Sequence, residues 1–304
     1  MEKIKFKSGD GTCAGDLYFP QGMKPGERRP ALVIGHGFGV VKKSLVEVGK
    51  HFAKAGYLTL AIDYRTFGES EGEPRGQLFP LNQVEDFRSA ISYMQTRADV
   101  DPDRIGIWGT SFGGAVVIYT AAVDLRAKAV VSQVPVVNGR RWMQALHHSA
   151  AWDGLMTRLR EDRDRRYRGE PSARIPPTQR GGPDGIVPMD PYTLVVFDEY
   201  TKRTGLPLVV ADPLITLESV EKVIEFFPEN VIQYIAPRPV HIITTARRDV
   251  IHLLEHIQDA FKKANEPKKL VLLPFEAYDL YWDPGRSAAL DKALECFREY
   301  IPVS

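Results

Sequence analysis

The stretch RIGIWGTSFGG, residues 104–114, decides the fold of this chain. An apolar strand at 104–108 runs into a serine between two glycines, and a helical run at 115–122 follows. A serine at such a tight turn is held with its hydroxyl exposed above a sheet, and glycines flank it because side chains there would clash. The helix N-terminus favours developing negative charge. We predict that Ser111 is a nucleophile, with an ordinary turn serine as the alternative.

Short β-branched runs alternate with helical patterns on both sides of this stretch, which is typical of βαβ units around a mostly parallel sheet. We expect about eight strands, with an antiparallel start and helices on both faces. The predicted strands are 3–7, 15–19, 31–34, 58–62, 104–108, 127–132, 240–244 and 269–273, and the predicted helices are 44–55, 81–94, 115–122, 253–264 and 287–300.

The alternation stops over residues 134–235, which predicts an insertion into a core formed by residues 1–133 and 236–304. Ligands of open α/β sheets bind at the carboxyl ends of the strands, so we predict a mostly helical cap over the serine. Four apolar residues in the insertion recur at nearly helical spacing and are predicted to line a substrate pocket. The alternative is that they only pack the cap onto the core. They are Trp142, Leu146, Trp152 and Met156.

A second glycine-rich stretch, GHGFG at residues 35–39, follows the strand at 31–34. The oxyanion of an acyl-transfer intermediate needs two preorganised N–H donors, and such a loop can supply one of them. We expect the donors to be the amides of Phe38 and Phe112. His36 is expected to order the loop by hydrogen bonding, with a general base as the alternative.

Three further motifs carry a family resemblance: DYRTFGESEG at 63–72, EPKKL at 266–270 and YDLY at 278–281. Together with the serine turn, they resemble the dienelactone-hydrolase and X-Pro-dipeptidyl-peptidase-like branch of the α/β-hydrolases, which includes polyketide transferases. The resemblance implies an α/β-hydrolase fold. It also implies transfer of an acyl group from a small ester, thioester, lactone or amide through a serine ester, without a metal or organic cofactor.

The resemblance also implies where the rest of a catalytic triad should lie. Asp249, after the strand at 240–244, matches the acid, with a helix N-cap as the alternative. The family has its histidine directly before an aromatic-Asp-Leu-Tyr sequence, and here that position is Ala277. We therefore expect little or no activity. His252 and His256 are the remaining bases, and we expect them on a helix surface.

Two explanations of Ala277 stay open. An engineered His-to-Ala variant of a serine hydrolase or acyltransferase is favoured, because the other site residues are intact. The alternative is a catalytically dead fold that binds a small ligand. Four residues of the 63–72 motif are expected to shape the rim of the site without doing chemistry, since they precede the serine in the chain. They are Asp63, Tyr64, Arg65 and Glu69.

The composition excludes some partners. The chain has 40 Lys and Arg residues against 39 Asp and Glu residues, so it offers no net field for nucleic acid. No apolar run is long enough to be a signal peptide or to span a membrane, and we expect a cytoplasmic protein. Cys13 and Cys296 match no metal or redox spacing and are expected to be unpaired. A homodimer is left open.

Overall fold

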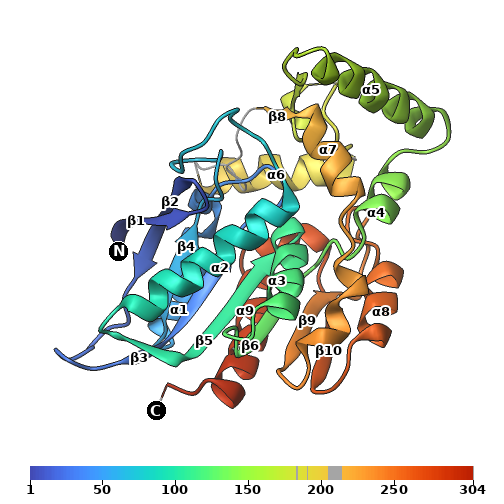
Figure 1. Ribbon diagram of the computed structural model, residues 1–304. Helices are drawn as coiled ribbons and strands as arrows, with labels where there is room; N and C mark the ends of the chain where they lie inside the picture. Colours follow the sequence, from blue (N-terminus) through green and yellow to red (C-terminus); the bar gives the residue numbers. More distant parts are fainter. Residues whose placement is uncertain (183, 190, 205–213, 304) are drawn as a thin grey trace.

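The computed structural model describes residues 1–182, 184–189, 191–204 and 214–303. Its main sheet contains eight strands, as predicted (Figure 1). The first two pairings in the sheet order, β1 with β2 and β2 with β4, are antiparallel, and the other five are parallel. The order is β1 (Glu2–Ser8), β2 (Gly11–Tyr18), β4 (Leu58–Ile62), β3 (Arg29–Gly35), β5 (Val100–Thr110), β6 (Ala129–Gln133), β9 (Val240–Thr245) and β10 (Lys268–Leu273).

Helices cover both faces of this sheet. Successive side chains of a strand point to opposite faces, so in β3 Val33 packs into one apolar cluster while Leu32 and Ile34 pack into another. The first cluster receives α2 (Pro80–Thr96), α3 (Phe112–Val123) and α8 (Leu254–Lys263). The second receives α1 (Val46–Lys54) and α9 (Gly285–Tyr300), whose Phe52 and Phe297 rings meet at 5.7 Å.

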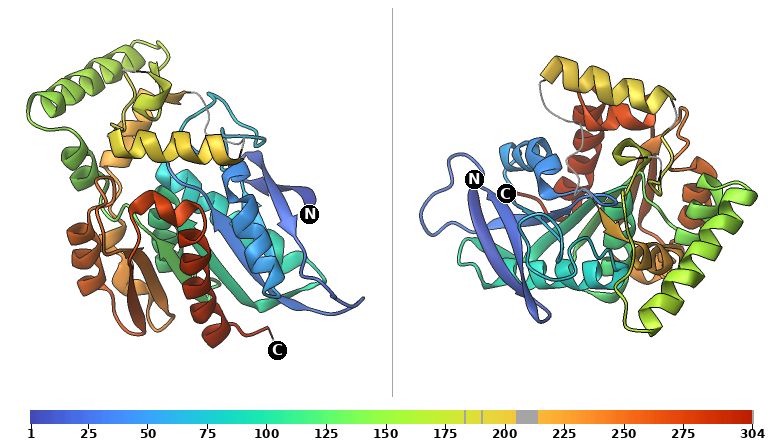
Figure 2. Two further views of the ribbon diagram at one scale, coloured as in Figure 1. Left: turned by 180° about the vertical axis from the view of Figure 1, so that it is seen from behind. Right: turned by 90° about the horizontal axis from the view of Figure 1, so that it is seen from above.

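The segment between β6 and β9 interrupts the core pattern. Its helices α5 and α7 lie beyond the ends of the strands in Figure 1 and in the left view of Figure 2, and the view from above shows α6 apart from α5. Its last turns, η3 and η4, pack against α3 and α8 of the core. A two-stranded sheet of β7 and β8 was not expected. The elements are α4 (Gly139–Leu146), α5 (Ala150–Tyr167), β7 (Arg174–Ile175), η2 (Gln179–Gly181), α6 (Pro191–Thr204), β8 (Ile215–Thr216), α7 (Leu217–Ile224), η3 (Pro228–Asn230) and η4 (Ile232–Ile235).

An ionic cluster joins α5 to α7. The buried Asp162 carboxylate accepts hydrogen bonds from Arg166 Nε at 3.0 Å and from the Ala173 amide at 2.7 Å. The same guanidinium binds Glu218 at 2.8 Å and Glu221 at 2.5 Å. Charges buried in this way need partners, and here Asp162 and Arg166 each have at least two. The cluster therefore fixes the two helices relative to each other.

Both cysteines are free, as predicted, and the structure shows both to be buried. None of the helices in the described ranges is long and apolar enough to cross a lipid bilayer. Two short turns complete the core near the site: η1 (Lys42–Leu45) follows β3, and η5 (Ala277–Tyr281) follows β10.

Candidate active site

Ser111 lies at the sharp turn between β5 and α3. Its backbone has φ 56° and ψ −120°, a conformation that residues with a side chain rarely adopt. A Cβ on Gly109 would come within 2.2 Å of the Gly113 carbonyl oxygen, and a Cβ on Gly113 within 2.4 Å of the His36 carbonyl oxygen. The two glycines are therefore required by close backbone packing. The strained turn presents the Ser111 hydroxyl at the carboxyl end of β5.

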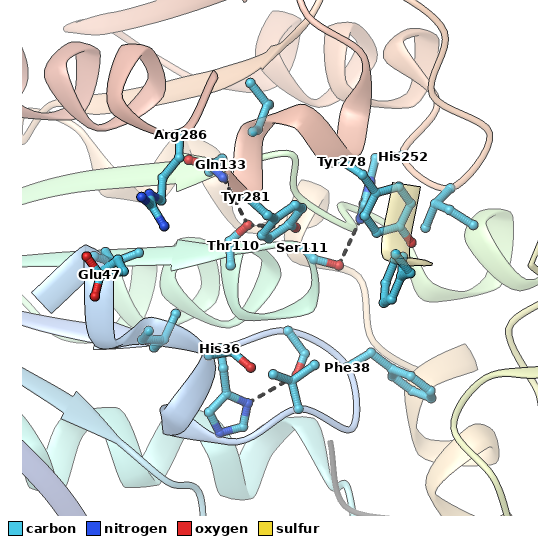
Figure 3. Close-up of a pocket in the computed structure, with 18 of the residues that line it drawn as sticks. His36, Phe38, Glu47, Thr110, Ser111, Gln133, His252, Tyr278, Tyr281 and Arg286 are labelled. Atoms are coloured by element: carbon cyan, nitrogen blue, oxygen red, sulfur yellow. Dashed lines mark hydrogen bonds between the residues drawn. The ribbon is translucent and has the colours of Figure 1, made fainter. Parts of the chain in front are cut away.

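His252 connects Ser111 to Asp249 (Figure 3). Its Nε2 lies 2.8 Å from Ser111 Oγ, and its Nδ1 lies 2.9 Å from Asp249 Oδ2. A carboxylate can only accept, so Nδ1 carries the proton and Nε2 accepts a hydrogen bond from the serine hydroxyl. Both the His252 and the Asp249 side chains are about 3% exposed. The three side chains form a continuous hydrogen-bonded relay, in which the histidine and the aspartate are shielded from water.

The loop that carries both residues explains the arrangement. Asp249 Oδ1 accepts hydrogen bonds from the amides of Ile251 at 2.8 Å and His252 at 2.7 Å. This turn folds the chain back so that the ring three residues after the aspartate faces the other oxygen of the same carboxylate. Asp249 thus caps the turn and orients the ring at the same time.

The expectation that no histidine reaches Ser111 is wrong. α8 begins at Leu254, so His252 belongs to an irregular loop, is 5% exposed and does not lie on a helix surface. Ala277 is the first residue of η5, and its side chain lies outside the part of the structure that is described. The sequence did hold a signal: Ser111, Asp249 and His252 follow one another in the order serine, acid, histidine.

The two residues predicted to supply the oxyanion donors lie on either side of Ser111. Phe112 is the first residue of α3, and Phe38 lies in the loop after β3. Their rings meet edge to face at 5.9 Å. A Cβ on Gly37 would lie 3.2 Å from the Ser111 Cβ, so this loop passes directly against the serine. The loop and the helix N-terminus are thus both within reach of a group bound at Ser111.

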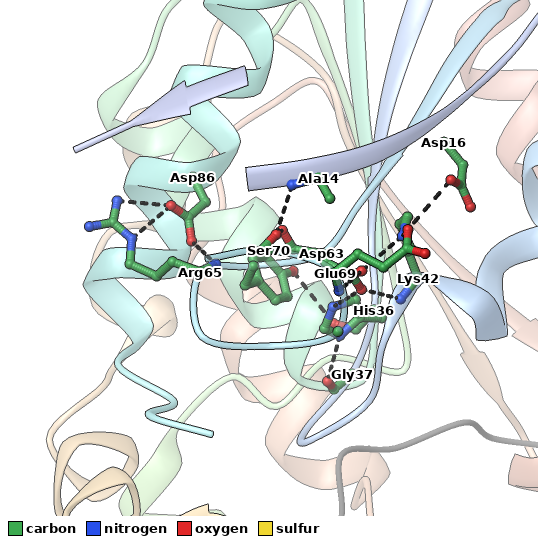
Figure 4. A network of polar contacts seen from close by, with 12 residues as sticks. Ala14, Asp16, His36, Gly37, Lys42, Asp63, Arg65, Glu69, Ser70 and Asp86 are labelled. Carbon is green, nitrogen blue, oxygen red and sulfur yellow. Dashed lines mark hydrogen bonds and ion pairs between the residues drawn. The ribbon is translucent and has the colours of Figure 1, made fainter. Parts of the chain in front are cut away.

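A buried ionic network lies behind the loop (Figure 4). Asp63 accepts hydrogen bonds from the Lys42 amide at 2.7 Å and the Lys42 ammonium at 3.0 Å, and Lys42 also binds Glu69 at 2.5 Å. Hydrogen bonds from Lys3 and Lys42 lower the pKa of Glu69 to about 2. His36 is buried and lies 3.2 Å from the Gly37 carbonyl oxygen through Nδ1. The network fixes both ends of the loop.

The residues predicted to form the rim belong to this buried region instead. Asp63 and Tyr64 are at most 1% exposed, and Arg65 binds Asp86. Among the described residues, the cavity lining includes neither these three nor Glu69. Their predicted position at the rim is therefore wrong.

A cavity of about 570 Å³ opens over Ser111. Of the four predicted cap residues, Trp142 lines it, and its ring meets the Phe38 ring at 5.4 Å. The Trp142 indole N–H donates to the Ile251 carbonyl oxygen at 2.9 Å, next to His252. The other three are partly buried, pack against the core and do not line the cavity; they are Leu146, Trp152 and Met156.

The cavity also has a polar wall. Tyr281 and Thr110 share a hydrogen bond of 2.9 Å between their hydroxyl groups, and the Gln133 amide donates to Thr110 Oγ1 at 3.4 Å. Burial raises the pKa of Tyr281, so its hydroxyl stays protonated at neutral pH. Among the described residues, no group of three or more His, Cys, Asp or Glu side chains is arranged to hold a metal ion.

Comparison with known proteins identifies the family. Residues 48–175 match the model of the prolyl oligopeptidase family. A polyketide transferase of Stachybotrys chlorohalonatus is 30% identical over 276 residues, which cover 89% of this chain and 87% of that protein. The quorum-quenching protein AidA of Acinetobacter baumannii is 42% identical over 137 residues. That match covers 45% of this chain and only 44% of the relative.

A solved structure supports the same assignment. The α/β-hydrolase GrgF from Penicillium sp. sh18 has a TM-score of 0.81 to this chain at 25% identity, over 99% of this chain and 98% of that one. The relatives and structural neighbours thus include polyketide transferases, a thiohydrolase and an α/β-hydrolase. The chain belongs to the α/β-hydrolases, in the dienelactone-hydrolase-like branch that contains the polyketide transferases.

Proposed function

We propose that this chain is a serine hydrolase or acyltransferase that acts on an ester, thioester, lactone or amide through an acyl-enzyme at Ser111. One observation carries the proposal: the His252 ring lies within hydrogen-bond distance of both the Ser111 hydroxyl and the Asp249 carboxylate. A nucleophile, a base and a group that orients the base are the three parts that such chemistry needs.

The geometry supports a two-step reaction. Ser111 Oγ attacks the substrate carbonyl carbon while its proton passes to His252 Nε2, and Asp249 stabilises the imidazolium. The amides of Phe38 and Phe112 hold the oxyanion, and one such donor contributes roughly 10² to 10³ in turnover. Collapse of the intermediate breaks the bond to the leaving group, which takes the proton from His252. Water or another nucleophile then gives its proton to His252 and attacks the acyl-enzyme. The bond between the acyl carbon and Ser111 Oγ breaks, and Oγ takes the proton back from His252.

The segment at 134–235 completes the proposal as a cap over the substrate. Its Trp142, Val187 and Phe197 line the apolar part of the cavity above Ser111. An apolar cavity of this size suits the acyl chain of a small molecule. The relatives named polyketide transferases favour transfer to an acceptor other than water as the second step. A small-ligand binding protein was the alternative because no base was expected, and His252 removes that reason.

An active-site-directed probe tests the proposal. A fluorophosphonate should label the purified chain at Ser111, and 4-nitrophenyl esters should give a burst of nitrophenolate when the acyl-enzyme accumulates. Labelling should disappear in Ser111→Ala, while Ser132→Ala, in the neighbouring strand β6, serves as the control serine. A folded chain that is not labelled and hydrolyses no ester, thioester or lactone would overturn the proposal.

A further inference from the structure

Gln133, at the end of β6, is a buried polar group that is only partly satisfied. It is 2% exposed and lines the cavity. One end of its amide binds Thr110, and the other end, Oε1, has no hydrogen-bond partner among the described residues. A buried polar atom without a partner destabilises the fold, because it has lost its hydrogen bond to water. Such an atom in a cavity wall indicates a place where a ligand supplies the missing partner.

Arg286 lies on the same side of the cavity. It belongs to the first turn of α9, lines the cavity and is only 19% exposed. One terminal nitrogen of its guanidinium binds Asp283. A guanidinium has five N–H donors in a planar fork that matches a carboxylate, so donors remain for a ligand.

The charged residues that line the cavity also favour a ligand with a carboxylate. Four cationic side chains line it among the described residues, against the single carboxylate of Glu47. Glu47 is already paired with Lys50 at 2.8 Å. Arg180 pairs with Asp198 at 3.6 Å and Arg286 pairs with Asp283, so carboxylates outside the lining balance part of this charge. The lining itself carries more cations than carboxylates, which favours an anionic substrate. The cations are Lys43, Lys50, Arg180 and Arg286.

The position of His252 determines which part of a substrate lies next to Gln133 and Arg286. Figure 3 shows His252 on one side of Ser111, and Thr110, Gln133, Tyr281 and Arg286 on the other. The leaving group must take its proton from His252, so it lies on the histidine side. The acyl group then extends toward Gln133 and Arg286.

We propose that Gln133 and Arg286 form a subsite for an acyl group that ends in a carboxylate, so that the substrate is a half ester or half thioester of a dicarboxylic acid. This assignment rests on the proposed serine chemistry. Arg286 binds the carboxylate with two parallel N–H donors, and the Gln133 amide binds a polar group between it and the reacting carbonyl.

Matched substrates test the subsite. The anionic substrates are the mono-(4-nitrophenyl) esters of succinate, glutarate and adipate. Each is compared with the 4-nitrophenyl diester in which the free carboxylate is methylated, so that the length is kept and the charge is lost. Spontaneous hydrolysis is subtracted in each case. For at least one length, kcat/KM for the anionic ester should exceed that for its methyl ester by about tenfold or more, which is the range of a charge-assisted hydrogen bond.

Variants locate the preference. Arg286→Gln should lower the ratio of the two kcat/KM values by about tenfold, and Arg286→Lys by less, because an ammonium keeps the charge and loses the fork. Gln133→Met should lower kcat/KM for the anionic ester. Arg298→Gln removes the same charge from the exposed far end of α9 and should leave the ratio unchanged.

The outcomes separate this inference from the function on which it rests. Turnover of the methyl esters with no preference for the anionic ester at any length overturns the subsite and leaves the serine chemistry standing. An equal fall of both kcat/KM values in Arg286→Gln also overturns it. Absence of turnover on every ester, together with absence of labelling at Ser111, overturns both.

Discussion

At the scale of single residues, the proposed function depends on His252. It is the base within reach of Ser111, at 2.8 Å. We expect His252→Gln to lower kcat by about 10⁴ to 10⁶, with residual activity from the oxyanion donors and substrate binding. Steady-state hydrolysis of a 4-nitrophenyl ester measures the loss.

Two further variants control this result. His256→Gln changes a histidine whose Nε2 lies 3.8 Å from Glu255, and it should retain kcat within about twofold. Ala277→His places a histidine where the family pattern has one, and it should also change kcat little because a base is already present. A rise of several orders of magnitude in Ala277→His would show that His252 does not serve Ser111.

The same substitution at the two aspartates near the site should affect different quantities, kcat in one case and the free energy of unfolding in the other. Asp249→Asn loses the charge that stabilises the imidazolium, so kcat should fall by about 10⁴. Asp63→Asn loses the charge that holds the Lys42 ammonium, so the free energy of unfolding should fall by about 2 kcal/mol with a smaller change in kcat. Urea unfolding and ester hydrolysis on both variants give the two quantities. Loss of turnover in Asp63→Asn alone would contradict the assignment of the acid.

Single residues also mark the limit of what the sequence could predict. Ser111 could be assigned because the neighbouring glycines leave little choice of backbone, and Asp249 because it follows a strand end. His252 could not, because the pairing depends on a turn in which one carboxylate binds two amides and a ring. The family resemblance instead predicted the histidine at position 277, which is an alanine.

At the scale of elements, α4 links the cavity to the loop that carries the base. Trp142 donates a hydrogen bond to the Ile251 carbonyl oxygen, and its ring packs on Phe38. Trp142→Phe removes the hydrogen bond and keeps most of the packing. We expect a free energy of unfolding lower by about 1 kcal/mol and a lower kcat, because the base is less well fixed.

The contrasting variant is Trp152→Phe in α5. Trp152 lies outside the cavity lining and under the guanidinium of Arg140, 5.6 Å from the ring centroid. The Trp152→Phe substitution should leave both kcat and the preference between short and long acyl esters unchanged. Equal kinetic effects of the two substitutions would mean that Trp142 acts through general packing of the segment and not through the loop.

Most elements could be predicted because each buries a periodic set of apolar residues. The continuous apolar run of Leu32, Val33 and Ile34 is typical of a central strand, because its side chains pack alternately into the clusters on the two faces of the sheet. The strands β7 and β8 have two residues each, which is too short for any period to appear. The packing of the turns η3 and η4 against α3 and α8 could not be predicted, because it is a tertiary contact between segments far apart in the sequence.

At the scale of the whole molecule, the network behind the site makes stability depend on acid pH. The pKa of Glu69 is lowered to about 2 by Lys3 and Lys42, below its unfolded value of about 4.3. A lowered carboxyl pKa stabilises the fold above the unfolded pKa, and this contribution is lost as the pH falls toward 2. The effect is modest because the side chain is 40% exposed.

Comparison with Glu69→Gln isolates this contribution. The wild-type chain should be more stable than the variant at pH 6, and the difference should shrink steadily between pH 4.5 and pH 3. Denaturant unfolding at these pH values measures it. A difference that stays constant with pH would indicate that the Glu69 side chain acts through packing or neutral hydrogen bonds.

The close spacing of Asp249 and His252 has a consequence for how such an enzyme diverges. Residues 249–252 hold both the acid and the base of the proposed triad, so the two are inherited together. The connection after β10, which brings Tyr278 and Tyr281 into the cavity, is thereby released from holding a base. This connection can change in sequence and length without removing the base next to Ser111. Reactivity and substrate preference can therefore evolve in separate segments of the chain.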